Sequence, residues 1–310
     1  MSSPDLSTIL AGIKFANPVM NASGTWDLSA NEVLIDPKPG AYVSKTVKLE
    51  PVAGNKPPRL FDTNRYGILN AIGLAGVGIE AFQKEHLPHL LKMGRRVIVN
   101  ISGTTVDEYT RLTELLDDTG IDLIEVNISC PNVKRGMSFG QDQDATLELV
   151  SAIRPKTQLP LIVKLTPNVT NIVQIALAAQ AGGADILSLT NTLLGLHLDP
   201  ETGNPVLANI TGGLSGPALM PVALRCVWQV CHNREITIPV IGMGGITSLK
   251  DALEFLWAGA SAVAVGTANF AHPSTAMPEI IADLSNWLTD HNHSSFEAFR
   301  NVVKQKIQEG

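Results

Sequence analysis

The chain has 310 residues, 45% of them hydrophobic and 17% charged, so it can bury a large core and is not globally disordered. Its formal net charge of -6 argues against a nucleic-acid or anionic-membrane surface, because both need a concentrated basic patch. Three cysteines are too few for a disulfide framework, the start "MSSPDLSTIL" is a poor signal peptide, and no apolar run reaches the roughly 18 residues of a membrane span. We therefore expect a cytoplasmic protein that binds neither nucleic acid nor membrane and meets any anionic ligand with a local group of cations.

Short apolar runs rich in Val and Ile recur along the chain and predict its strands. They lack the alternation of a half-exposed strand, which is typical of a parallel sheet buried on both faces. The eight runs cover residues 17–24, 40–46, 96–102, 122–129, 160–167, 184–191, 239–245 and 261–268.

Segments with helical periodicity lie between most of these runs. Leu112, Leu115 and Leu116 repeat at helix spacing in a segment that stops at Gly120. Two later helical segments, 171–183 and 248–260, end in the related phrases "AGGADIL" and "AGASAVAV", which indicates a repeated βα unit. The simplest architecture is an α/β fold in which residues 1–310 form a single domain, a (β/α)8 TIM barrel with inserted loops over the C-terminal face of the barrel.

Two connections, 47–79 and 192–216, are too long for bare loops between a strand and a helix. Long insertions in a compact fold are usually functional, so we expect both to lie over one end of the barrel. The last segment, 295–308, is predicted to be an amphipathic helix that serves packing rather than chemistry.

Polar and glycine residues cluster where the eight runs end. In a barrel all eight C-terminal ends converge on one face, where sites are built. A single Asn at such an end is more often a turn former than a ligand, but this explanation does not account for so many polar side chains on one face. The residues are Ser23, Lys45, Asn100, Asn127, Lys164, Asn191, Gly244, Gly245, Gly266 and Thr267.

Two lysines of this group, Lys45 and Lys164, lie inside apolar runs, where an unpaired ammonium is costly. An anionic or electron-rich ligand is one complement, and a salt bridge to a carboxylate such as Glu125 is the alternative. The glycine-rich phrases "GMGGI", "VGT" and "TGGLSG" favour the ligand, because the loops after the last two strands of a barrel often bind phosphate through backbone N–H groups. A phosphorylated cofactor is the leading interpretation.

Cys130 lies in the loop after the fourth run, where a thiolate could accept a proton. Its ordinary pKa of roughly 8.5 leaves only a minor fraction ionised at neutral pH unless neighbours help. The alternative, a buried small hydrophobe, fits Cys226 and Cys231 better, because these two lie in a helical segment. No Cys/His set has zinc spacing, so we expect no metal site.

Several motifs together resemble the class 1 dihydroorotate dehydrogenases, and especially their type B catalytic subunits. They occur in order over nearly the whole chain: "NISCPNVK", "VKLTPNVT", "NTLLG", "ANITGGLSGPAL", "GMGGI" and "AVAVGTANF". The resemblance implies a TIM barrel that holds FMN and oxidises dihydroorotate to orotate in pyrimidine biosynthesis.

Carried over by position, the resemblance makes Cys130 the catalytic base, which takes the C5 proton while hydride leaves C6 for the flavin. Lys45 resembles a catalytic lysine shared by flavin and substrate, and Lys164 resembles the lysine near flavin N1 and O2. The substrate-binding positions are Lys45, Asn70, Ala71, Ile72, Gly73, Leu74, Asn127, Asn132, Asn191 and Thr192. The FMN positions are Ser23, Lys45, Thr46, Asn100, Asn127, Lys164, Thr190, Gly216, Gly244, Gly245, Gly266 and Thr267.

The type B resemblance also implies a partner. Those enzymes pass electrons to NAD through a second subunit that carries FAD and a [2Fe-2S] cluster, which three scattered cysteines cannot build in this chain. We expect a homodimer, or a heterotetramer with such a subunit. The loop after Cys130 differs from that of the homodimeric type A enzymes, which use fumarate.

Two alternatives stay open at this point. The flavin module of dihydropyrimidine dehydrogenases looks similar around the cysteine, but its loop reads "SCPH", and Asn132 therefore favours dihydroorotate. A non-catalytic barrel that serves as an assembly or phosphate-binding subunit is the other, and the joint presence of Lys45, Cys130 and Lys164 argues against it.

Overall fold

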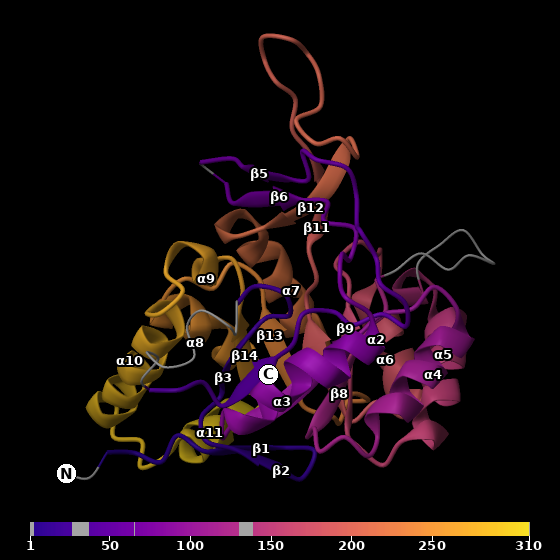
Figure 1. The fold of residues 1–310 in the computed structure, drawn as a ribbon. Coiled ribbons are helices and arrows are strands. Elements are labelled where there is room, and N and C mark those ends of the chain that lie inside the picture. Colours follow the sequence, from indigo (N-terminus) through magenta and orange to yellow (C-terminus); the bar gives the residue numbers. More distant parts are fainter. Residues whose placement is uncertain (1–2, 27–36, 65, 130–138, 310) are drawn as a thin grey trace.

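The computed structural model describes residues 3–26, 37–64, 66–129 and 139–309. Eight parallel strands close into a barrel, and their order around the ring follows their order along the chain (Figure 1). Each predicted apolar run contains one of these strands, so the predicted (β/α)8 architecture is confirmed. The strands are β3 (Val19–Asn21), β4 (Ala41–Val43), β7 (Arg96–Ile101), β8 (Leu123–Asn127), β9 (Leu161–Leu165), β10 (Ile186–Leu189), β13 (Val240–Met243) and β14 (Ala262–Val265).

Helices surround the barrel and separate its strands (Figure 1). Several begin at a residue that caps the first turn: Thr105, Asp142, Asn171 and Ser248 each accept a backbone N–H with the side chain. The helices are α2 (Ile79–Ala81), α3 (Leu87–Lys92), α4 (Val106–Leu116), α5 (Gln143–Ile153), α6 (Ile172–Ala181), α7 (Met220–Cys231), α8 (Leu249–Trp257), α9 (Ala268–Ala271), α10 (Ala276–Asp290) and α11 (Phe296–Glu309). Shorter helical turns are η1 (Phe82–His86), η2 (Phe139–Gln141), η3 (Arg154–Lys156) and η4 (Pro217–Leu219).

Alternate residues of each barrel strand point into the barrel and outward to the helices. On β8, Leu123 belongs to the apolar cluster inside the barrel, whereas Ile124 belongs to the cluster between strands and helices. The hairpin of β1 (Thr8–Leu10) and β2 (Ile13–Phe15) closes the N-terminal end, where Leu10 and Phe15 are buried in the inner cluster. The lower half of the barrel is therefore apolar.

The two long connections form a second sheet over the opposite, C-terminal end (Figure 1). Its antiparallel order is β11-β12-β6-β5, with β5 (Leu60–Asp62), β6 (Ile68–Asn70), β11 (Leu193–Leu196) and β12 (Thr211–Ser215). We call it the upper sheet. The predicted position of the two connections over the end of the barrel is confirmed, but the connections contain strands and are not bare loops. Asn70 of one connection pairs with Gly213 of the other, and local periodicity does not reveal such a long-range pairing.

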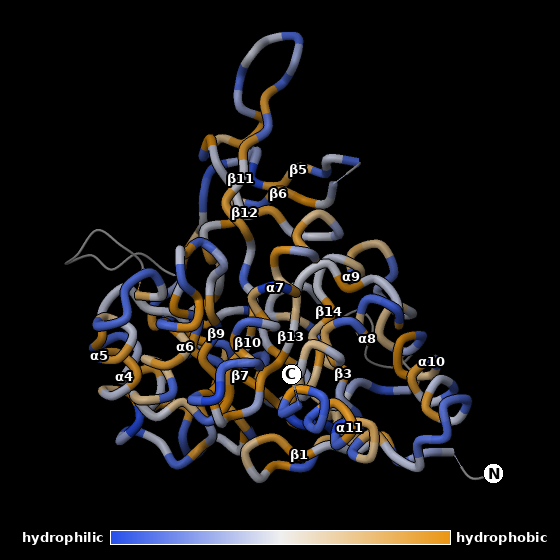
Figure 2. The backbone as a smooth tube through the Cα atoms, turned by 180° about the vertical axis from the view of Figure 1, so that it is seen from behind, coloured by the Kyte–Doolittle hydropathy of each residue, from blue (hydrophilic) through white to orange (hydrophobic). Residues whose placement is uncertain are grey.

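The predicted packing role of the last helix is confirmed. Phe296, Phe299 and Val303 of α11 are buried, and Phe299 contacts the Trp257 ring at the end of α8 edge to face. In Figure 2 the hydrophobic colour follows the barrel strands and continues upward along β11. Of the helices in the described part of the chain, none is both long and apolar enough to cross a membrane.

Candidate active site

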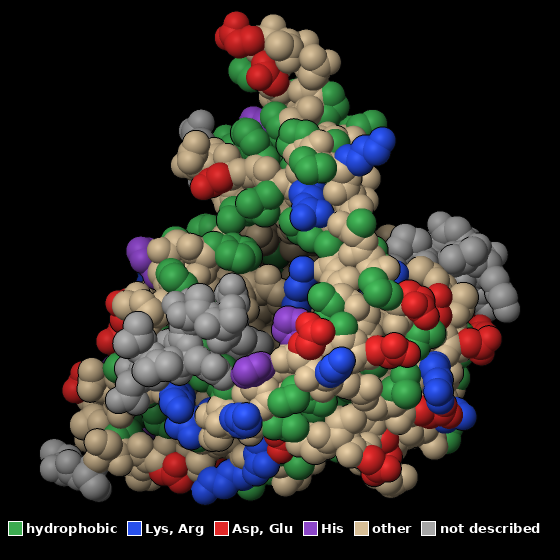
Figure 3. Space-filling view, viewed as in Figure 1, with side chains coloured by type: hydrophobic (Ala, Val, Ile, Leu, Met, Phe, Trp, Pro, Cys, Tyr) green, Lys and Arg blue, Asp and Glu red, His purple; other side chains and the backbone are tan. Residues whose placement is uncertain are grey.

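A pocket of about 780 Å³ lies between the carboxyl ends of the barrel strands and the upper sheet. Figure 3 shows the molecule hollowed in this region. Its volume is within the range of small-molecule and cofactor sites. It brings together most of the predicted site residues: Ser23, Lys45, Thr46, Asn70, Ala71, Ile72, Gly73, Leu74, Asn127, Lys164, Thr190, Asn191, Thr192, Gly216, Gly244, Gly245, Gly266 and Thr267. Cys130 and Asn132 lie outside the described residues, and Asn100 lies beneath the pocket rather than in its lining.

The pocket is positively charged although the protein is acidic. Three lysines line it, Lys45, Lys48 and Lys164, whereas none of its described lining residues is a carboxylate. Lys164 is 7% exposed, as its place inside an apolar run suggests. The expected burial of Lys45 is wrong, because β4 ends at Val43 and the Lys45 side chain is exposed at the rim. The arrangement suits an anionic ligand, which net charge alone would not have indicated.

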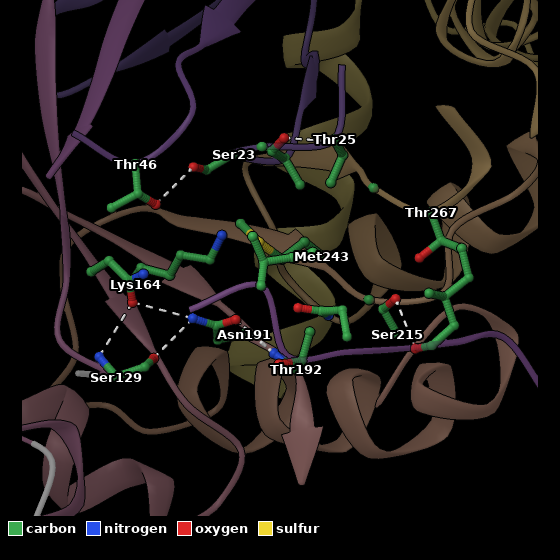
Figure 4. A pocket seen from close by; sticks show the side chains of 18 of the residues that line it. Ser23, Thr25, Thr46, Ser129, Lys164, Asn191, Thr192, Ser215, Met243 and Thr267 are labelled. Carbon is green, nitrogen blue, oxygen red and sulfur yellow. Dashed lines mark hydrogen bonds between the residues drawn. The ribbon is translucent and has the colours of Figure 1, made fainter. Parts of the chain in front are cut away.

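A network of amides and hydroxyls forms one side of the pocket. Asn191 Nδ2 donates to Asn127 Oδ1 at 3.2 Å and to Ser129 Oγ at 2.9 Å, and Figure 4 shows Asn191 and Ser129 facing one another. Thr192 N donates to Asn191 Oδ1 at 2.8 Å, and the Tyr109 hydroxyl, on α4, donates to the Asn127 carbonyl at 2.6 Å. The Asn127 and Asn191 side chains are therefore fixed in place and present groups that can match a planar polar ring.

Small hydroxyl residues from the loops after β3 and β4 form another part of the lining. Ser23 Oγ donates to the Ser44 carbonyl at 2.9 Å and lies 3.4 Å from Thr46 Oγ1 (Figure 4). Thr25 Oγ1 donates to the Ala22 carbonyl at 2.7 Å. These bonds fix the loops that follow the first two barrel strands.

Glycines bring the backbone close to the pocket after β12, β13 and β14. Gly244 and Gly245 have φ values of 131° and 79°, a region that favours glycine. A Cβ at Gly245 would lie 2.7 Å from Met220 Cβ and 2.9 Å from the Gly216 carbonyl oxygen, so no side chain fits there. These glycines line the pocket with backbone, whereas phosphate binding at this corner stays a prediction.

Beneath the pocket, Lys164 pairs with a buried carboxylate. Lys164 Nζ lies 4.0 Å from Glu125 Oε2, and the Glu125 side chain is 4% exposed. The salt-bridge alternative raised from the sequence is therefore present for Lys164. It does not replace the ligand interpretation, because Lys164 lines the pocket as well.

Sequence reasoning missed six polar or sulfur-bearing lining residues: Thr25, Lys48, Asn55, Ser129, Ser215 and Met243. Ser129 and Met243 had a signal, since each stands at or just after the end of a barrel strand. Lys48 and Asn55 had none, because they come from a connection whose course only the tertiary structure shows.

These features define a class of protein. A parallel (β/α)8 barrel with a polar, cationic and glycine-rich pocket at the carboxyl ends of its strands has the architecture of a barrel enzyme, and its pocket suits an anionic ligand. A family model described as dihydroorotate dehydrogenase matches residues 5–288. The chain belongs to the dihydroorotate dehydrogenase family and is an oxidoreductase.

Relatives with curated names agree with this family. The chain is 50% identical over 308 residues to a protein of Geobacter sp. (strain M21), covering 98% of this chain and 100% of the relative. It is 53% identical over 280 residues to one of Geotalea uraniireducens, covering 89% and 91%, and 48% identical over 295 residues to one of Alkaliphilus oremlandii, covering 94% and 96%. All three are named dihydroorotate dehydrogenase B (NAD(+)), catalytic subunit.

The residues present fit a phosphorylated flavin. Among the described residues, Thr190 Oγ1 and Asn100 Oδ1 are buried polar atoms without a hydrogen-bond partner, and a buried acceptor or donor is rarely left so. Thr190 lines the pocket, while the corner of Gly216, Gly244 and Gly245 leaves backbone free for a phosphate. The cationic lining completes a site of the right chemistry for FMN.

Proposed function

We propose that this chain oxidises dihydroorotate to orotate with FMN as the hydride acceptor, a step of pyrimidine biosynthesis. The observation that carries the proposal is the joint lining of one pocket by Lys45, Lys164, the amides of Asn127 and Asn191, and a glycine corner. An anionic pyrimidine needs both cations and amides, and a flavin phosphate needs accessible backbone. The curated names of the relatives support the same reaction.

In the proposed reaction, the two hydrogens that leave the substrate go to different acceptors. The Cys130 thiolate takes the C5 proton, and the C6 hydrogen leaves as hydride with the electron pair of its bond. FMN, when bound, supplies the acceptor for that hydride. Lys45 binds the substrate anion from the pocket rim, whereas Lys164, at the pocket floor, favours negative charge on the cofactor.

The remaining proposed site residues bind without taking part in proton transfer. Substrate binding falls to Asn127, Asn191, Thr192, Asn132 and the segment from Asn70 to Leu74, which carries amide groups and a backbone turn with positive φ at Gly73 and Leu74. FMN binding falls to Ser23, Thr46, Asn100, Thr190, Gly216, Gly244, Gly245, Gly266 and Thr267.

The test is reduction of the purified protein by dihydroorotate without oxygen. A yellow protein that bleaches with dihydroorotate supports the proposal, whereas a colourless protein that takes up no FMN rejects it and favours a non-catalytic barrel. Bleaching by dihydrouracil in preference to dihydroorotate would point to the dihydropyrimidine dehydrogenase alternative.

The base assignment has its own test. Cys130→Ala should retain FMN and slow bleaching by about two orders of magnitude or more, the range lost with an acid or base catalyst. Cys226→Ala is the matched control, because Cys226 is buried on α7 outside the pocket lining. Equal bleaching rates in Cys130→Ala and wild type would reject the assigned base.

We also propose that electrons leave through a partner subunit that carries FAD and a [2Fe-2S] cluster and reduces NAD. The words "catalytic subunit" in the names of the relatives support a partner. The measurement is dihydroorotate oxidation with NAD or fumarate by the protein alone and by the material that co-purifies with it. Fumarate reduction by the protein alone would contradict the type B assignment.

A homodimeric core is part of the same proposal. Leu194 and Leu196 on the outer strand β11, and Ile210 just before β12, are 64%, 51% and 58% exposed. Such apolar groups on a projecting sheet suit burial against another protein. Light scattering should give a dimer or larger assembly for wild type. A monomer at micromolar concentration would reject it.

A further inference from the structure

Glu125 is a buried carboxylate to which the proposed function gives no role. It stands at the third position of β8, two residues above Leu123 and two below Asn127, so all three point into the barrel. Leu123 belongs to the apolar inner cluster, whereas Asn127 lines the pocket. Glu125 therefore lies in the layer between the apolar floor of the barrel and the pocket.

Three side chains of other strands converge on this carboxylate. Asn100 Nδ2, on β7, donates to Oε2 at 2.5 Å, and Ser188 Oγ, on β10, donates to Oε1 at 2.8 Å. Strand β9 separates β8 from β10, so the bond from Ser188 crosses the barrel interior. Lys164, on β9, is the third partner at 4.0 Å. Both carboxylate oxygens are thus engaged, which offsets the cost of burying the charge.

The Lys164 ammonium lies beside the Glu125 carboxylate but does not form a hydrogen bond with it. A separation of 4.0 Å exceeds hydrogen-bond distance, so the N–H groups of Lys164 remain able to meet an acceptor in the pocket. Yet both side chains are more than nine-tenths buried, where charges are poorly screened and the anion cancels part of the cation's field. The pocket floor presents a fixed and partly neutralised positive charge.

The network also reaches the other proposed cofactor residues. The Asn100 backbone N–H donates to Ser44 Oγ at 3.0 Å, and Ser44 Oγ donates to the Lys45 carbonyl at 2.9 Å. The Asn100 amide is oriented by its bond to Glu125, which leaves Asn100 Oδ1 as the atom without a partner. Glu125 thereby sets which end of the Asn100 amide is free.

We propose that Glu125 is a positioning residue that fixes Lys164 and Asn100 beneath the cofactor pocket and, by partly neutralising the Lys164 ammonium, lowers the reduction potential of the bound flavin. The inference rests on FMN binding as proposed above. An anion close to the cofactor disfavours the electron-rich reduced form, so removing that anion should favour reduction.

The experiment compares flavin reduction potentials by dye equilibration in the full-length protein. Glu125→Gln keeps the size of the side chain and removes its charge. We expect the equilibrium constant for two-electron reduction to rise about tenfold, which is a potential higher by about 30 mV. Glu125→Asp withdraws the charge by one methylene and should shift the potential in the same direction by less.

Two controls separate charge from structure. Ser188→Ala removes the bond to Oε1 and leaves both charges, and Glu114→Gln makes the same chemical change in an exposed glutamate that pairs with Lys156 at 2.8 Å. Both should leave the reduction equilibrium within about twofold of wild type. A merely structural role would lower the melting temperature of Glu125→Gln and leave its potential unchanged.

The outcomes can be told apart. FMN binding with an unchanged or lowered potential in Glu125→Gln contradicts the inference alone, as does an equal shift in Ser188→Ala. If Glu125→Gln fails to fold, an unchanged potential in Glu125→Asp contradicts it equally. A wild-type protein that takes up no FMN contradicts the proposed function and the inference with it.

Discussion

The side chain of Asn191 donates to Asn127 Oδ1 at 3.2 Å, although the two residues are 64 positions apart. Asn127 is the last residue of β8, and Asn191 follows β10. Because β9 lies between these two strands, the bond links strand ends that are not neighbours in the barrel. The same Nδ2 binds Ser129, the neighbour of Cys130. A pair of amides oriented in this way can recognise a pyrimidine at low entropic cost, because neither has to be ordered on binding.

Removal of the Asn191 amide should weaken substrate and product binding. We expect Asn191→Ala to raise the Kd of orotate about tenfold or more, since it removes one ligand group and frees Asn127, each bond being worth about 1 kcal/mol. Titration of the flavin spectrum with orotate measures it. Asn209→Ala, in the exposed turn before β12, is the control, and equal affinities in the two variants would count against the site.

Lys164→Ala should reduce both FMN affinity and stability, for different reasons. Loss of a charged group that meets the cofactor should raise the Kd of FMN by about tenfold to a hundredfold, whereas the buried Glu125 left without its cation should lower the melting temperature. The double variant Lys164→Ala/Glu125→Gln should regain the melting temperature but not the FMN affinity. Lys156→Ala, at an exposed pair with Glu114, should change neither.

The two described cysteines should resist thiol reagents in the native protein. Burial raises the pKa of the Cys226 thiol and raises the pKa of Cys231 to about 12, so little thiolate is present at pH 8. In Cys130→Ala, labelling by a disulfide reagent at pH 8 should therefore be slow until the protein is unfolded. Rapid native labelling of both thiols would contradict this expectation.

Asp251 should stabilise the protein in a pH-dependent way. Burial alone would raise the pKa of Asp251, but hydrogen bonds from Thr247 and Ser248 at the start of α8 outweigh burial and lower it. A lowered folded-state pKa means that the stabilisation is present above the unfolded pKa and is lost as pH falls through the folded one. Asp251→Asn should cost about 1 kcal/mol at pH 7, and the difference from wild type should shrink in acid.

Urea unfolding of both proteins at pH 7 and at decreasing pH checks this expectation. Asp283→Asn, an exposed change inside α10, is the control and should be neutral. A stability difference for Asp251→Asn that stays constant down to strongly acidic pH would contradict the role of the carboxylate.

Much of the site could be predicted because it depends on the local hydrophobic pattern of the strands and on the closure of the barrel. Buried parallel strands show as continuous apolar runs, and the closure of eight such strands places every strand end on one face. For this reason Lys164, Asn127 and Asn191 could be assigned to one pocket from the sequence, and the two lysine alternatives could be stated in advance. Cys130 and Asn132 stay predictions, since they lie outside the described residues.

Other features depend on distant segments meeting. Pairing of Asn70 with Gly213 turns two connections into the upper sheet, and the end of β4 at Val43 leaves Lys45 exposed. Lys48 and Asn55 line the pocket because the tertiary structure places the connection 47–79 above it.

The sequence by itself determined the barrel, the face that carries the site and most residues of its lining, because strand and helix periodicity act over a few neighbouring residues. Only the tertiary structure decided that Asn100, Ser188 and Lys164 meet at one carboxylate, Glu125. That meeting follows from the stagger between four neighbouring strands, and a shift of one residue in any of them would turn its side chain out of the barrel.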